Sequence, residues 1–167
     1  MLTKSLSLTS DNITYDLEDA VSASMKPSAR KSLHTHLTTL PSRPSSLGEL
    51  AVRINAVSTP YALDDLLSIA AIPTVDTIVI PKVNSPADLS FVTDVLRHTA
   101  PNRKPIKLIA LIESARAVMD LRAICAAGAE SNLDGLIFAA EDFALDLSIT
   151  RTPSRWCSGG QTPLRRW

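Results

Sequence analysis

Short runs of apolar residues recur along the chain and alternate with segments in which apolar positions are three or four residues apart. The runs are rich in Ile, Val and Leu, and their unbroken apolar character is typical of parallel strands buried on both faces. Five strands are predicted: "ITYDL" at 13–17, "LAVRIN" at 50–55, "DTIVIPKV" at 76–83, "KLIALIE" at 107–113 and "LDGLIFAAE" at 133–141.

The segments between these runs have the period of helices. Helices are predicted at 26–40, 58–71, 84–98 and 114–128. In the third, Ser85 is placed to cap the helix and Pro86 suits its first position. The apolar face of the last is expected to contain Ala115, Val118, Leu121 and Cys125. Strands that alternate with helices in this way predict an α/β protein built from right-handed βαβ crossovers.

Charged residues follow every predicted strand, at or just beyond its carboxyl end. They are Asp16, Glu18 and Asp19, then Arg53, Lys82 and Glu113, and finally Glu141 and Asp142. In a β/α barrel the carboxyl ends of all strands form the active-site face, whereas an open doubly wound sheet binds ligands mainly at one switch point. Charges at the ends of all five strands therefore favour the barrel.

Helix capping is the ordinary alternative for each of these acids, because a carboxylate at a strand–helix junction stabilises the amino end of the helix. Glu113, which precedes "SARAV", and Asp19 are the best candidates for that role. Capping does not explain Arg53 or Lys82, since cations are unfavourable at helix amino ends. Acids and cations on one face predict a site for a metal ion and an anionic substrate.

Composition narrows the classes of function. The 167 residues are 45% hydrophobic and 20% charged, which predicts one globular domain. The 17 basic and 17 acidic residues cancel, and no basic stripe appears, so we expect neither nucleic acid nor a membrane surface as a partner. No apolar run reaches the roughly 18 residues of a membrane span. We expect a soluble protein, and the sequence leaves the mitochondrion and the cytoplasm open as its compartment.

Five motifs resemble, in order and spacing, those of the HpcH/HpaI aldolase and citrate lyase β-subunit family. They are "YDLEDAV" with "KPSAR" downstream, "VRIN", "VIPKV", "LIESARAV" and "GLIFAAEDFALDLSITRT". The resemblance covers about residues 1–153 and is nearest to the citrate lyase β-like branch, which includes malyl-CoA and citramalyl-CoA lyases. It implies a TIM barrel, Mg²⁺ dependence and cleavage of a carbon–carbon bond in a hydroxyacyl-CoA thioester. It also implies a homo-oligomer in the full-length form.

The resemblance further assigns roles to residues. It implies that Glu113 and Asp142 bind the metal ion, that Arg53 binds the substrate, and that Glu113 also contacts the substrate. These three are the expected catalytic residues. The residues expected to surround them, and to organise Arg53 or metal-bound water, are Asp16, Glu18, Asp19 and Lys82.

The number of predicted strands is smaller than the eight of a complete barrel, which takes about 250 residues. We expect residues 1–153 to form a partial TIM barrel with about five of the eight strands, beginning with the remnant of a helix. We expect residues 154–167, which follow no such pattern, to be an aberrant tail. Two interpretations compete with an acyl-CoA lyase. One is a class II aldolase that releases pyruvate from free hydroxy-keto acids, and the other is a catalytically inactive truncated relic.

Overall fold

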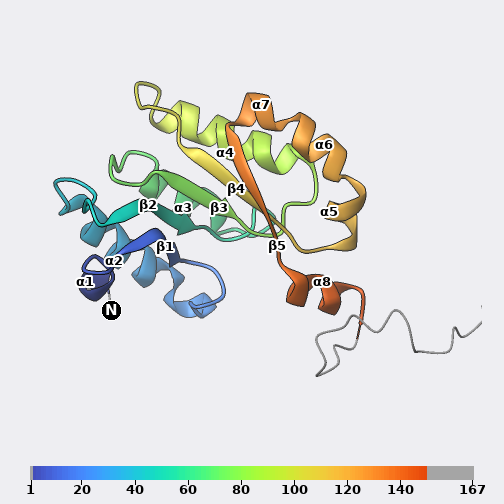
Figure 1. Cartoon of the computed structure of the whole chain (residues 1–167), viewed down its shortest axis with the longest axis horizontal. Coiled ribbons are helices and arrows are strands. Elements are labelled where there is room, and N and C mark those ends of the chain that lie inside the picture. The colour runs from blue at the N-terminus through green and yellow to red at the C-terminus, as the bar shows by residue number, and fades with distance from the viewer. Residues whose placement is uncertain (1, 150–167) are drawn as a thin grey trace, which may run out of the picture.

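The computed structural model describes residues 2–149, which form a single parallel sheet with helices packed against it (Figure 1). The strands are β1 (Ser10–Asp16), β2 (Leu47–Arg53), β3 (Thr77–Ile80), β4 (Lys107–Ile112) and β5 (Leu133–Phe138). Their order in the sheet is their order in the chain, and every neighbouring pair is parallel. A barrel has this sequential order, whereas the order reverses in a doubly wound sheet. The predicted α/β fold with a five-stranded part of a barrel is confirmed.

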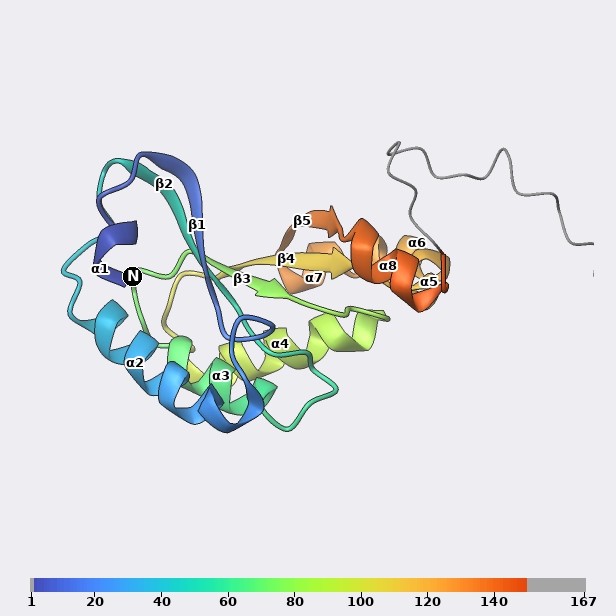
Figure 2. The same ribbon diagram turned by 90° about the horizontal axis from the view of Figure 1, so that it is seen from below.

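The helices connect the strands. They are α1 (Leu2–Ser5), α2 (Lys26–Thr38), α3 (Ala62–Ile69), α4 (Pro86–Thr99), α5 (Ala115–Met119), α6 (Leu121–Ala126), α7 (Gly128–Ser131) and α8 (Ala140–Asp146), and the 3₁₀ turn η1 (Ala23–Met25) precedes α2. Seen from below, α2, α3 and α4 lie along one face of the sheet (Figure 2). The expected helix remnant at the start of the chain is α1. Within residues 2–149, the helices are too short or too polar to cross a membrane.

The main core lies between the sheet and these helices. Alternate strand residues such as Leu50, Val52 and Ile78 are fully buried there, together with Leu66 of α3 and Leu89 of α4. The intervening strand residues form a second, smaller apolar cluster, which consists of Ala51, Val79 and Leu111. Because side chains alternate between the two faces of a strand, this second cluster lies on the face that lines the interior of a closed barrel.

Helix α4 begins as the sequence predicts. Ser85 and Asp88 form a capping box, and Pro86 occupies the first turn. The helix predicted at 114–128 is instead broken into α5, α6 and α7. The chain leaves helical geometry at Asp120, and this resets the phase of the helix, so one apolar face no longer runs through the whole segment. Contrary to the prediction, Val118 and Cys125 are exposed, and Ala117 and Ile124 are buried in their place.

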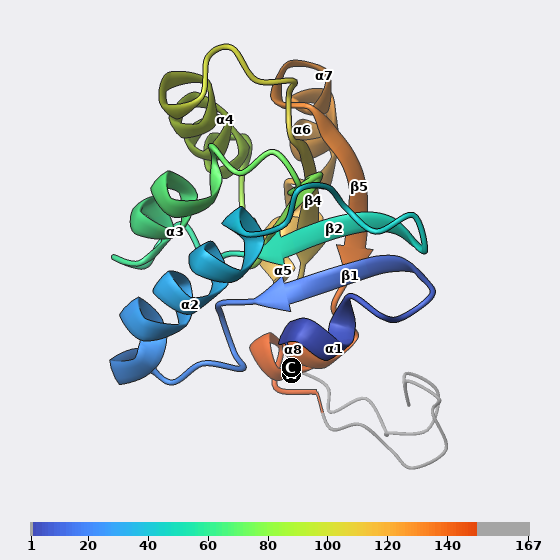
Figure 3. The ribbon, with the colours of Figure 1, turned by 90° about the vertical axis from the view of Figure 1, so that its left-hand side faces the viewer.

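The two edges of the sheet are β1 and β5, each of which has one neighbouring strand in the described part of the chain. The first edge lies toward the viewer in Figure 3, which shows β1 in front of the sheet. Three consecutive apolar residues of the other edge, Leu136, Ile137 and Phe138, are exposed. The predicted boundary at residue 153 and the predicted tail at 154–167 lie outside the described residues.

Candidate functional site

The ends of β1 and β2 are joined by an ion pair. The register of the two strands places Asp16 opposite Arg53. The guanidinium of Arg53 donates from Nε to Oδ1 of Asp16 at 2.8 Å and from Nη2 to Oδ2 at 2.7 Å. This bidentate geometry gives a charge-assisted pair with a fixed orientation. Arg53 therefore stands in one position before any substrate arrives.

Asp16 also holds the loop that follows β1. Its carboxylate accepts hydrogen bonds from the backbone N–H groups of Glu18, at 2.8 Å, and Ala20, at 3.0 Å. Burial alone would raise the pKa of Asp16, but the hydrogen bonds from Arg53 and from the loop outweigh burial and lower it. The hydrogen bonds to Asp16 in turn raise the pKa of Arg53. Both side chains are charged at neutral pH.

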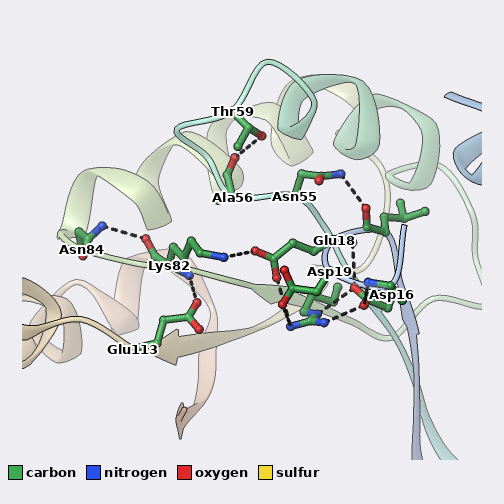
Figure 4. A network of polar contacts seen from close by, with 12 residues as sticks. Asp16, Glu18, Asp19, Asn55, Ala56, Thr59, Lys82, Asn84 and Glu113 are labelled. Carbon is green, nitrogen blue, oxygen red and sulfur yellow. Dashed lines mark hydrogen bonds and ion pairs between the residues drawn. The ribbon is translucent and has the colours of Figure 1, made fainter. Parts of the chain in front are cut away.

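Glu18 lies between Arg53 and Lys82 and contacts both. Its carboxylate is 7% exposed, and Oε1 lies 2.6 Å from Nζ of Lys82 (Figure 4). The other oxygen, Oε2, lies 3.1 Å from Nη1 of Arg53, yet it is buried and accepts no hydrogen bond from residues 2–149. Asp19 is more exposed, and its carboxylate is 3.4 Å from the same Nη1. A buried carboxylate oxygen with no hydrogen bond is unusual, and it marks Glu18 as a group that gains from a further donor or cation.

Lys82 links this cluster to the end of β4. Its backbone has a φ of 53°, a left-handed conformation that costs a residue other than glycine about 1 kcal/mol. The backbone N–H of Lys82 donates to Oε1 of Glu113 at 2.5 Å, while the side chain reaches Glu18 (Figure 4). Burial alone would lower the pKa of Lys82, but the ion pair with Glu18 raises it. Unusual backbone geometry of this kind is common at functional sites.

Glu113 and Asp142 lie close together at the ends of β4 and β5. Ala139 donates to the carbonyl of Ile112 at 3.0 Å, which holds the start of α8 beside the end of β4. Burial, and after it a hydrogen bond with Asp142, raise the pKa of Glu113 to about 7, against the opposing effect of Lys82. The two carboxyl groups are therefore near enough to share a proton.

Helix capping does not explain the two acids that suited it best. Ser114, and not Glu113, caps α5, because its hydroxyl accepts a hydrogen bond from the N–H of Ala117 at 3.0 Å. Glu113 is 4% exposed and accepts from Lys82. Asp19 caps neither η1 nor α2, and it lies beside Arg53 instead. The structure thus gathers all seven residues named from the sequence at the carboxyl edge of the sheet.

Sequence reasoning missed a buried polar network behind this cluster. Asp65 of α3 is 1% exposed and accepts hydrogen bonds from Nδ2 of Asn55 at 2.6 Å and from its backbone N–H at 2.9 Å. Its other oxygen accepts from Nε of Arg30 at 2.8 Å. Asn55 also donates to the carbonyl of Leu17, so the network fixes the ends of β1 and β2 against α2 and α3. The sequence feature that could have indicated this network is the pair of acids, Asp64 and Asp65, within the helix predicted at 58–71.

The fit of a metal ion depends on Glu113 and Asp142. Within residues 2–149, no group of three or more His, Cys, Asp or Glu side chains is arranged to hold one. Mg²⁺, however, needs only one or two carboxylates and takes its other ligands from water and substrate. Two carboxyl groups this close together also suit a divalent cation, because its positive charge neutralises two negative charges. The donor set therefore fits Mg²⁺.

A parallel arc of strands with acids and cations gathered at its carboxyl edge is the arrangement of a β/α-barrel protein, whose sites lie at that edge. The model of one family, HpcH/HpaI aldolase/citrate lyase, matches residues 1–157. The chain belongs to this family.

Two curated relatives and one solved structure are similar to this chain. Citrate lyase subunit beta of Leuconostoc mesenteroides subsp. cremoris is 34% identical over 147 residues, which cover 86% of this chain and 47% of that protein. Human mitochondrial citramalyl-CoA lyase is 30% identical over 156 residues, with 86% and 44% covered. The chain thus spans less than half the length of these relatives. The pyruvate/acetyl-CoA complex of Haloferax volcanii malate synthase, at 19% identity, shares the fold with a TM-score of 0.75 over 92% of this chain and 46% of that one.

Proposed function

We propose that this chain carries the metal-binding and substrate-binding half of a lyase that cleaves a carbon–carbon bond in a hydroxyacyl-CoA thioester. The observation that supports it is the unbroken series of contacts from Asp16 through Arg53, Glu18 and Lys82 to Glu113. This series crosses four strand ends and brings two fixed cations within reach of a pair of carboxyls. Two relatives are named as citrate lyase subunit beta and citramalyl-CoA lyase, which agrees with this chemistry.

The reaction has simple requirements. The hydroxyl group of the substrate loses its proton and becomes a carbonyl, the carbon–carbon bond breaks, and its electron pair moves to the thioester as an enolate. A proton added to the enolate carbon completes the acyl-CoA product. Negative charge thus develops on the thioester oxygen during cleavage, and preorganised cations or N–H donors lower the barrier by stabilising that charge.

Arg53 is suited to bind the developing charge or a carboxylate of the substrate. Asp16 occupies Nε and Nη2, so the outward N–H groups of the guanidinium are held in a fixed direction. The ion pair with Glu18 holds a second cation, the ammonium group of Lys82, on the other oxygen of the carboxylate that Arg53 contacts. Glu113 and Asp142 would hold Mg²⁺, which supplies a Lewis acid and a template for oxygen ligands when bound.

The metal site can be tested in the 167-residue chain itself by isothermal titration with MgCl₂. Glu113→Gln and Asp142→Asn should each weaken Mg²⁺ binding about tenfold or more, because each removes a charged oxygen ligand. Asp94→Asn, at an exposed position on α4, is the matched control and should bind as the parent does. Parent-like affinity in both site variants would refute the metal assignment.

Substrate class requires a second test. Thioester and free-acid substrates should be compared side by side, in the 167-residue chain and in a chain joined to the remaining strands of a barrel. Mg²⁺-dependent cleavage of a hydroxyacyl-CoA supports the proposal. Cleavage of free hydroxy-keto acids alone would make the protein a pyruvate-releasing aldolase, and inactivity of both forms on either class would identify a relic.

A further inference from the structure

A cavity of about 490 Å³ lies at the opposite end of the sheet from the candidate site. Its walls come from the last turns of α4, the loop that leads into β4, and α7 with the residue before β5. Figure 1 shows α4 and α7 next to each other above the amino end of β5. Neither the proposed lyase reaction nor the ion-pair cluster uses any residue of this region.

The walls are tied together by hydrogen bonds. Arg97 of α4 donates from Nη2 to the carbonyl of Glu130 at 2.7 Å, and Thr93 donates to the carbonyl of Ser131 at 3.3 Å. Asn132 donates to the carbonyl of Ile106 at 2.7 Å, which joins the segments entering β4 and β5. The cavity is therefore formed by segments that are already fixed to each other, as ligand sites usually are.

The charge around the cavity is unbalanced. Three cations line it, Arg97, Arg103 and Lys104, against one carboxylate, Glu130. Arg103 donates to the carbonyls of Ala70 and Val75, so within residues 2–149 both arginines are bound by backbone oxygen and form no ion pair.

Burial lowers the pKa of Arg103, and the only charge that opposes the effect is Asp76, which is already paired with Arg43 at 3.0 Å. A partly buried guanidinium with uncompensated charge is stabilised when an anion binds beside it. Each arginine retains unused N–H donors, and Lys104 has no ion pair within the described residues.

The rest of the lining is apolar. Leu96, Ala100, Pro101, Pro105 and Ile106 contribute carbon surface between the cations. A site of this composition favours a ligand that has one acidic group and a compact apolar body over an inorganic ion, which would leave the apolar walls wet. We propose that this cavity binds a small organic anion, with its phosphate or carboxylate between Arg97, Arg103 and Lys104 and its apolar part against the proline-rich loop.

The test uses the full 167-residue chain and ligand-observed saturation-transfer NMR, which works for monomers and oligomers alike. The probes are phenyl phosphate and benzoate, with phenol as the neutral compound that has the same ring but no acidic group. Both anions should bind measurably more tightly than phenol. Lys104→Gln should weaken anion binding about fivefold to tenfold, because it removes a charged hydrogen-bond donor. Arg122→Gln, at an exposed position on α6, is the control and should have no effect.

A second variant separates this cavity from other apolar surfaces. Ala129→Trp places a large side chain at the exposed rim and should abolish binding of both anions without entering the core. Equal binding of phenol and the two anions would overturn the proposal, as would unchanged anion affinity in both Lys104→Gln and Ala129→Trp. Absence of saturation transfer to either anion at millimolar concentration would overturn it too. None of these outcomes bears on the lyase proposal.

Discussion

Asp16 fixes the orientation of Arg53, because two nitrogens of the guanidinium are bound to that carboxylate, while the third, Nη1, lies near Glu18 and Asp19. Lysine at position 53 would keep the positive charge but would lose the planar fork, which holds Asp16 with two nitrogens and leaves Nη1 to contact other oxygen atoms. The function of this residue thus rests on its geometry more than on its charge.

Arg53→Lys is expected to lower kcat/KM about a hundredfold, or about 2.7 kcal/mol of transition-state stabilisation. The affinity for Mg²⁺ should stay at the parent value, because among the described residues the ion-pair partners of Arg53 are Asp16, Glu18 and Asp19, and not Glu113 or Asp142. Steady-state kinetics and metal titration of a chain completed to a closed barrel measure the two effects. Arg116→Lys on α5 serves as the control, and full activity of the Arg53 variant would contradict the role.

Stability in acid should depend on Asp16. Its pKa is lower in the folded protein than the value of about 3.9 in an unfolded chain. An acid with a lowered pKa stabilises the fold fully above the unfolded pKa, and that contribution is lost as pH falls through the folded pKa. The free energy of unfolding should therefore fall below about pH 4, and by less in Asp16→Asn. Urea unfolding at several pH values measures this difference, and identical pH profiles would show that the pair with Arg53 contributes nothing.

At the scale of elements, strands were easier to predict than helices. The strands within runs such as 76–83 and 107–113 are buried on both faces. Strands of this kind consist of consecutive apolar residues, which are easy to recognise in the sequence. The carboxyl ends of parallel strands share one edge, so the placement of Arg53, Lys82 and Glu113 followed from counting strands. The break at Asp120 could not be seen, because residues 114–128 contain no proline and no glycine before Gly128.

The contacts within the site were less predictable than its location. The link from Lys82 to Glu113 uses a backbone N–H in a left-handed conformation, which no pattern of side chains records. Burial of Asp65 was also hidden, because acids in the first turn of a helix are common at exposed positions. In both cases the contact is formed with residues that are distant in the sequence, so the local pattern of side chains does not indicate it.

Asp65 and Asp64 provide a matched pair for the network that fixes α3 to β2. Both contact Arg30, but the side chain of Asp65 is 1% exposed, whereas that of Asp64 is 61% exposed. Asp65→Asn should destabilise the protein by about 3 kcal/mol, since it removes the buried negative charge beside Arg30 and puts an NH2 group in place of one of the two oxygens that accept from Arg30 and Asn55. Asp64→Asn should cost less than about 1 kcal/mol. Denaturant unfolding measures the loss of unfolding free energy in each variant. Equal losses would mean that the network does not anchor α3 to β2.

At the scale of the whole molecule, the described residues leave a sheet open at both edges. Leu136, Ile137 and Phe138 of β5 expose 40%, 47% and 56% of their surfaces, next to backbone N–H and C=O groups that have no further strand to pair with. A parallel sheet normally has both faces covered and its edges closed or blocked. The expected homo-oligomer of the full-length form remains a prediction, and from this edge we also expect the 167-residue chain to associate.

The 167-residue chain, purified alone, should therefore form concentration-dependent assemblies and show little Mg²⁺-dependent lyase activity, since the described strands do not enclose a substrate. Ile137→Lys should shift sedimentation toward the monomer, because a lysine on an edge strand opposes pairing with another strand. Leu67→Lys is the control: Leu67 is 50% exposed on α3, away from either edge, and its replacement should not change sedimentation. Joining the chain to the strands that complete a barrel should cover β5 and restore both a single species and activity. A monodisperse, active parent chain would contradict the half-barrel account.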